Sequence, residues 1–220
     1  MEDIIYSNDE VLSLSSRHEL FDISFYKTAD YFRTIENFVG FVKACEKLVR
    51  NSTEYSHFKG QLIGMGLTRC QILGNIESDE DDIVEVEMHH GPILTLFDYC
   101  AIIIDALIAR NEKINTFRVA RLVIDEHFEG NVQVVMLSKT VHQLVDSGEI
   151  FIHFNQATGN INNFLMKYRD GLNEERIQKI NRYIDLCSQF NTFDNGLLDL
   201  KNTITNWDYE IAKQRVENNK

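Results

Sequence analysis

The chain carries very few of the residues that interrupt helices. Its 220 residues include a single proline, Pro92, and only 11 glycines. Because proline and glycine mark turns, a chain this poor in both favours helices over a many-turned β sandwich. Hydrophobic residues make up 44% of the chain, which is enough for a sizeable core and gives no sign of disorder. The length suits one large domain, or a compact core with helical extensions.

The formal net charge of −12 at pH 7 restricts how the chain can bind other molecules. Broad, non-specific adhesion to nucleic acid needs a basic surface, which this composition does not supply. A nuclease remains compatible with the charge. A divalent cation and a local basic stripe can hold phosphates while the rest of the surface stays acidic.

The cysteines and the start of the chain indicate a protein of a reducing cytoplasm. The four cysteines are scattered, and no two have the Cys-x-x-Cys spacing of a zinc clip. Residues 1–5 are acidic where a signal peptide would be basic, and no apolar run reaches the roughly 18 residues that span a bilayer. We therefore expect a soluble cytoplasmic protein with no membrane partner, in the host cytoplasm if the chain is viral.

The spacing of apolar residues predicts a mainly helical chain with two strands. Helices are expected at residues 19–49, 93–110, 116–127, 138–148, 160–169, 173–190 and 197–216. Residues 55–73 include three glycines that suggest turns, and the acidic run at 77–82 is interpreted as a solvated loop. Apolar and polar residues alternate from Val84 to His89, as in a half-buried strand, and the apolar run at 132–137 predicts the second strand.

Two adjacent histidines, His89 and His90, follow this alternation. Neighbouring residues on a strand point to opposite sides, so both can serve one site only where the strand ends. Gly91 and Pro92 supply that end. The pattern predicts that one histidine holds a cation while its neighbour faces a water.

In these residues the sequence resembles the HNH endonuclease family, whose core is a ββα-metal fold. The family's first strand ends in a His-His or Asp-His pair, which the two adjacent histidines match. Its second half runs from an asparagine through an apolar strand to a helical histidine, as residues 131–142 do here, and Leu137 and His142 have the family's spacing. The resemblance covers roughly residues 70–150, with the helices at 93–127 inserted, and its style is that of a phage-encoded member.

The resemblance implies a role for each residue. His89 and His142 would be metal ligands, and His90 would be the general base that activates water for attack on a phosphodiester. Asn131 would hold the loop of this base and orient its imidazole. A neutral imidazole with a pKa near 7 suits a base, and a cation with open positions stabilises the leaving oxygen.

Two departures from the family concern zinc and the central asparagine. Ser138 and Val141 stand where many members carry cysteines, so we expect no structural zinc. Asn131 lies further from His142 than is usual in the family. Either a bulge absorbs this difference, or Gln133 takes the central position instead.

A third departure concerns the ligands of the cation. Asp146 stands where some members have a second helical histidine, four residues after His142 and on the same helix face. A carboxylate is a hard oxygen ligand. A site of His89, His142 and Asp146 would therefore suit Mg²⁺ or Mn²⁺ better than a closed zinc site.

The sequence thus predicts an α+β protein, in which a small ββα-metal (HNH-like) core lies within a mainly helical chain. Residues 1–69 form a helical N-terminal extension, 70–150 the core with its helical insertion, and 151–220 a helical C-terminal extension that could mediate a homo-oligomer. The expected function is metal-dependent hydrolysis or nicking of nucleic acid, with DNA as the expected partner.

Two other functions remain open from the sequence. One is a catalytically silent phage-type HNH-fold protein that binds and modulates a host protein, which the acidic charge favours. The other is a metal-dependent hydrolase of a small phosphorylated molecule, which needs no basic groove. Several charged or titratable residues are interpreted as structural or solubilising, namely Glu85, Glu87, Arg110, Lys113, Arg118, Arg121, His127 and Lys139.

Overall fold

A computed structural model describes residues 25–74, 76–77, 85–190 and 196–205. The chain is rich in helices and holds one small antiparallel sheet of two strands, so the predicted α+β class is confirmed. The elements are η1 (Ala29–Arg33), α3 (Ile35–Arg50), α4 (Thr53–Gly64), β1 (Val86–His90), α5 (Leu96–Ala109), α6 (Thr116–Phe128), β2 (Val134–Ser138), α7 (Lys139–Asp146), η2 (Phe154–Gln156), α8 (Ile161–Lys167), η3 (Arg169–Gly171) and α9 (Glu174–Cys187). Residues 196–205 are also helical.

The longer helices begin where the sequence supplies a capping side chain. Thr34, Ser52, Thr95, Asn115 and Asn173 each accept a hydrogen bond from the backbone amide three residues further along. Such a bond satisfies one of the amides that the first turn of a helix leaves without a partner.

The helix α4 was not predicted from the sequence, because its glycines suggested turns. Ser52 caps this helix, and Tyr55, Phe58 and Leu62 are buried along one of its faces at helical spacing. Burial of this apolar face outweighs the roughly 1 kcal/mol by which each internal glycine disfavours a helix relative to alanine. The third glycine of the segment, Gly66, follows the helix with a φ of 88°.

The sheet pairs β1 with β2 in antiparallel register, with His89 opposite Val135 and His90 opposite Val134. Alternate residues face opposite sides of the sheet. Val86, Met88 and His90 therefore share one face, and Glu87 and His89 share the other. Beyond β2, Gln71 and Thr158 form backbone hydrogen bonds with Met136 and Val134, so further chain segments cover the outer edge of that strand.

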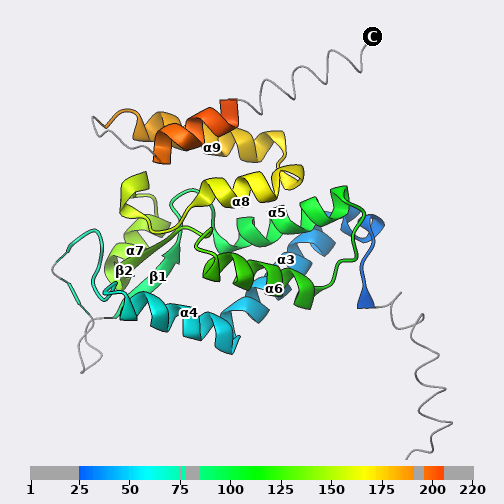
Figure 1. The fold of residues 1–220 in the computed structure, drawn as a ribbon, viewed down its shortest axis with the longest axis horizontal. Coiled ribbons are helices and arrows are strands. Elements are labelled where there is room, and N and C mark those ends of the chain that lie inside the picture. Colours follow the sequence, from blue (N-terminus) through cyan, green and yellow to red (C-terminus); the bar gives the residue numbers. More distant parts are fainter. Residues whose placement is uncertain (1–24, 75, 78–84, 191–195, 206–220) are drawn as a thin grey trace, which may run out of the picture.

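Helices cover both faces of the sheet. The face of Met88 packs against the main core, in which α3, α5 and α6 contact one another and α4 contacts α6. The opposite face packs against α7, where Val135, Leu137 and Val141 are buried together. Figure 1 shows β1, β2 and α7 grouped at one side of the molecule, next to one end of α4.

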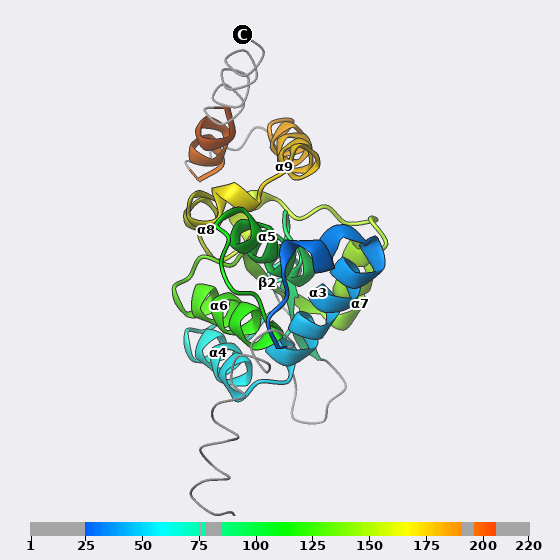
Figure 2. The ribbon, with the colours of Figure 1, turned by 90° about the vertical axis from the view of Figure 1, so that its right-hand side faces the viewer.

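The C-terminal helices lie at the end of the molecule remote from α4. Helix α9 and the helical residues 196–205 lie side by side there, above α8 (Figures 1 and 2). The close approach of η3 to α5 requires Gly171, because a Cβ at this position would lie 2.0 Å from the carbonyl oxygen of Ile102. Residues 206–216 of the last predicted helix lie outside the described residues.

Other predictions also fall partly outside the described residues. These include the start of the first helix, at residues 19–24, and most of the acidic run at 77–82. No helix in the described part of the chain is long and apolar enough to cross a bilayer.

Candidate metal centre

Strand β1 and helix α7 bring His89, His142 and Asp146 together. One ligand atom from each residue lies within 4.8 Å of the other two. Nδ1 of His89 is 3.9 Å from Asp146 Oδ1, and Nε2 of His142 is 3.7 Å from Asp146 Oδ2. Among the described residues, this is the one cluster of at least three histidine, cysteine or acidic side chains with such spacing. The three metal ligands expected from the sequence are therefore neighbours in the structure.

Local structure explains this convergence. His142 and Asp146 are one helical turn apart on α7, so both project from the same face. Helix α7 begins directly after β2, with Ser138 at its N-terminal cap, and this short connection returns the helix across the sheet. His89 lies on the face of β1 that α7 covers. The side chain of Asp146 is 64% exposed, so the cluster opens to solvent on this side.

Glu87 adds a contact that the sequence reading did not assign. Its Oε2 lies 2.6 Å from Nδ1 of His142, and its side chain is 32% exposed. The carboxylate accepts a hydrogen bond from Nδ1–H, which leaves the lone pair of Nε2 directed toward Asp146. A carboxylate that fixes the tautomer of a metal-binding histidine in this way raises its affinity for the metal.

The pKa of His89 is lowered from its ordinary value. Burial of the imidazole is the largest cause, and repulsion from His142 adds to it, while attraction to Asp146 opposes it. A neutral imidazole carries a lone pair that can bind a cation, so His89 is in the binding form at neutral pH.

His90 lies away from this cluster. It faces the core, is 5% exposed and stacks on Tyr55 with ring centroids 6.0 Å apart. Its Nε2 lies 3.0 Å from Nε2 of His127. Burial lowers the pKa of His90 well below its usual value, with His127 as the second cause. The role of a base facing water beside the cation does not fit this position, because the alternation of the strand directs His90 into the core and His89 toward the opposite face, where α7 lies.

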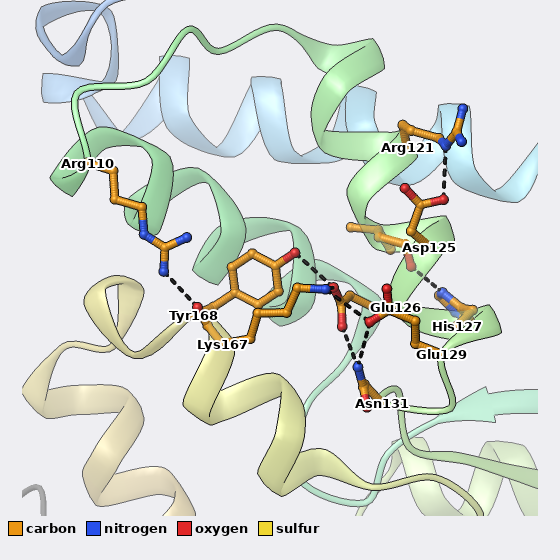
Figure 3. Close-up of polar contacts among 10 residues, drawn as sticks. Arg110, Arg121, Asp125, Glu126, His127, Glu129, Asn131, Lys167 and Tyr168 are labelled. Carbon is orange, nitrogen blue, oxygen red and sulfur yellow. Dashed lines mark hydrogen bonds and ion pairs between the residues drawn. The ribbon is translucent and has the colours of Figure 1, made fainter.

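Asn131 also lies in a different environment from the one predicted. Its side-chain amide donates hydrogen bonds to Glu126 and Glu129, at 2.7 and 3.1 Å. Buried Glu126 also accepts a hydrogen bond from the hydroxyl of Tyr168 and pairs with Lys167. Figure 3 shows these side chains meeting between α6 and α8. Asn131 therefore supports the carboxylate of Glu126, which joins α6 to the end of α8, and its side-chain amide makes no hydrogen bond to the imidazole of His90.

Gln133, the alternative to Asn131, is fully buried at the start of β2. Its backbone amide donates to the hydroxyl of Tyr99. Neither its side-chain nitrogen nor its side-chain oxygen has a hydrogen-bond partner among the described residues. The side chain of neither candidate thus forms a hydrogen bond with the imidazole of His90 in the described part of the chain.

The basic residues interpreted as solubilising do not gather into one stripe. Arg110 pairs with Asp170 beside α8, and Arg121 pairs with Asp125 within α6, both at 2.9 Å. Figure 3 shows that these two arginines lie well apart. Lys139 lies nearer the cluster, with its Nζ 3.9 Å from Glu85. The interpretation of the arginines as solubilising residues fits these positions.

A groove of about 480 Å³ adjoins the cluster along β1. His142 and Glu87 line one side of it, and Arg50 and Lys59 line another. Three protein ligands leave further coordination positions of a cation open to solvent or to a bound molecule. The arrangement is thus chemically suited to hold a divalent cation beside an anionic ligand.

Comparisons with known proteins give one match. The model of a family described as bacteriophage G278-like virion protein matches residues 3–210. No curated protein and no solved structure matches the chain.

Proposed function

Because the chain belongs to the bacteriophage G278-like virion protein family, we propose that it is a phage protein that binds one divalent cation and hydrolyses phosphodiester bonds of nucleic acid. The proposed ligands are His89, His142 and Asp146. DNA is the proposed substrate, and the host cytoplasm is the proposed place of action. A homo-oligomer formed through the C-terminal helices stays a prediction.

One observation carries the proposal, namely the convergence of the imidazoles of His89 and His142 with the carboxylate of Asp146. The carboxylate of Glu87 supports this cluster through its hydrogen bond with Nδ1 of His142. Ligands from a strand and from the helix after the second strand are also what an HNH-like ββα-metal core would provide. Two nitrogen donors favour a first-row transition ion over Mg²⁺, which prefers oxygen ligands. Of the two cations expected from the sequence, we therefore propose Mn²⁺ ahead of Mg²⁺.

The chemistry we propose does not use His90. A divalent cation at this site would polarise a phosphoryl oxygen and lower the pKa of a nearby water. Glu87 holds His142 in the tautomer that binds the cation, and the exposed side of Asp146 leaves room for the phosphate to approach. Water with its pKa lowered by a bound cation could pass its proton to solvent, so the proposed chemistry needs no histidine base.

A second candidate function is a metal-bound but catalytically silent protein that binds a host protein. The burial of His90 against His127 favours it, because the residue that resembles the family's base is inaccessible to water. The net charge of −12 favours it too. In this case the cation would link β1 to α7 and stabilise the fold without catalysing a reaction.

The experiment that separates these functions combines binding and cleavage. Supercoiled plasmid, or a phosphodiester of low molecular weight, is incubated with the protein in Mn²⁺, Mg²⁺ or EDTA to measure cleavage. Thermal unfolding of the protein is followed under the same conditions. His142→Ala removes a ligand, and His57→Ala serves as a control at an exposed histidine.

We expect Mn²⁺ to raise the melting temperature and to support plasmid nicking, with both effects lost in His142→Ala and kept in His57→Ala. A rise in melting temperature without cleavage would favour the silent protein, and cleavage of the ester alone would favour a small-molecule hydrolase. If Mn²⁺ changes neither property of the folded protein, the metal centre itself is wrong.

A further inference from the structure

The groove beside the metal centre follows the edge of β1 that faces away from β2. The backbone of Glu85 and Gly91 bonds to Lys139 and Gln133, so the odd-numbered residues of β1 direct their backbone groups toward β2. Antiparallel pairing alternates, and Met88 therefore directs its N–H and C=O away from β2. These two groups make no hydrogen bond with the described residues, and Met88 lines the groove.

Two basic side chains lie along this edge. Lys59, on α4, makes no ion pair with a carboxylate of the described residues, and its Nζ lies 5.7 Å from the ring centroid of Tyr55. Arg50, at the end of α3, is 53% exposed and is 3.7 Å from Glu46. An ion pair of this length at the surface is weak and leaves the guanidinium open to another anion.

The acidic residues of the groove lie on the side of the metal centre. Glu87 is held by its hydrogen bond to His142, and Glu85 faces Lys139. These carboxylates repel an anion in the groove, and a divalent cation at the cluster would offset that repulsion. Anion binding at this edge should therefore be stronger when the cation is bound.

We propose that this groove binds the sugar–phosphate backbone of a single nucleic-acid strand, with Lys59 and Arg50 contacting phosphates next to the cation. The proposal rests on the proposed function and names the strand-binding part of the same site. Single-stranded nucleic acid fits this groove better than a duplex, because the groove offers two basic side chains along the edge of β1. Binding of a duplex requires a wider basic surface than this acidic chain provides.

The number of phosphates contacted sets the salt dependence of binding. For single strands, the logarithm of the association constant falls with the logarithm of salt concentration with a slope of about −0.7 per phosphate contacted. Two contacts predict a slope near −1.4, and loss of Lys59 should reduce its magnitude by about 0.7. This slope is a property of phosphate contacts and is not altered by a general loss of stability.

The test uses fluorescence anisotropy with a labelled phosphorothioate oligothymidine, which resists cleavage, between roughly 50 and 200 mM salt. The full chain is measured in Mn²⁺ and in EDTA, as are Lys59→Gln and Arg50→Gln. Lys201→Gln is the matched control, because Lys201 is exposed and its helix lies at the opposite end of the molecule. Thermal unfolding in Mn²⁺ confirms that every variant is folded and still responds to the cation.

We expect about fivefold weaker binding for each groove variant, the predicted change of slope, and no change for Lys201→Gln. Tighter binding of a matched duplex than of the single strand, or an unchanged slope for Lys59→Gln, would overturn the proposal. Strand binding that depends on the groove without any cleavage of natural DNA would support the groove and reject the hydrolytic function. A protein that is stabilised by Mn²⁺ but binds no strand would reject the groove and leave the metal centre intact.

Discussion

The Nε2 atoms of His90 and His127 lie 3.0 Å apart in the core, and only one of them can donate the hydrogen bond. Nδ1 of His127 is 2.7 Å from the carbonyl oxygen of Val123, which can only accept. Burial lowers the pKa of His127 to about 4, so this imidazole is neutral and carries its proton on Nδ1. Its Nε2 therefore accepts, and Nε2–H of His90 donates.

This pair predicts that stability falls as the pH falls below neutrality. The pKa of each imidazole is lower in the folded chain than its ordinary value of about 6.5, with burial as the main cause and the nearby charge of Arg50 also lowering that of His90. The unfolded chain therefore takes up protons first. Above about pH 6.5 the free energy of unfolding should keep its value at neutral pH. It should decline as the pH falls toward 4, by about 3 kcal/mol for His127 alone.

Urea unfolding at several pH values measures this decline. His127→Gln retains a side chain that can hydrogen-bond to His90 but removes one titrating group, so its decline should be smaller. His57→Gln changes an exposed histidine and should behave as the original protein. A decline of equal size in all three proteins would place the titrating groups elsewhere.

The position of His90 on the core face of β1 can be predicted from the sequence, although the predicted metal site did not take it into account. His90 continues the alternation of Val86 and Met88, and this apolar face of the strand is the one that packs against the core. The assumption that the strand end at Gly91 lets both histidines serve one site assigned His90 to the water side instead. Its partner His127 lies 37 residues away on α6, and no local pattern gives that distance.

The metal ligands were more accessible to sequence reasoning. The spacing of His142 and Asp146 places both on one helix face, and period-two alternation places Glu87 on the same side of β1 as His89. The identity of the helix that covers this face depends on tertiary packing, because both faces of β2 are buried and its apolar run does not distinguish them. Helix α4 and the groove beside it escaped prediction for a similar reason.

Glu87 should strengthen cation binding without touching the cation. In Glu87→Gln the side-chain oxygen can still accept the hydrogen bond from His142, but the negative charge that makes the imidazole a better ligand is lost. We expect Mn²⁺ affinity to fall by about 10-fold to 100-fold, measured by isothermal titration calorimetry. Glu85→Gln, directly before the same strand, is the matched control, and its affinity should stay close to that of the original chain. Equal affinities for all three proteins would contradict the orienting role of Glu87.

Gln133 should be a source of instability. Its side chain is fully buried, and its amide has no hydrogen-bond partner among the described residues. Methionine has a similar shape and needs no partner, so Gln133→Met should raise the free energy of unfolding by about 1 kcal/mol in chemical denaturation. Gln61→Met at an exposed position should leave it nearly unchanged. A loss of stability in Gln133→Met would mean that the buried amide makes a contact that stabilises the fold.

Substitution of Asn131 tests whether this residue has a structural role or the catalytic role that the sequence resemblance implied. Its amide bonds to the carboxylate of Glu126, which is 1% exposed and also contacts Tyr168 and Lys167. Asn131→Ala removes one hydrogen bond to a buried charge, so we expect the free energy of unfolding to fall by about 2 kcal/mol. Mn²⁺ affinity and any plasmid cleavage at a temperature where the variant is folded should be unchanged, because Asn131 does not contact the metal centre. Asn51→Ala, at the exposed end of α3, controls for the loss of an amide side chain. Loss of cleavage in Asn131→Ala with normal stability would restore its catalytic role, because a residue that only supports the buried carboxylate of Glu126 cannot produce that result.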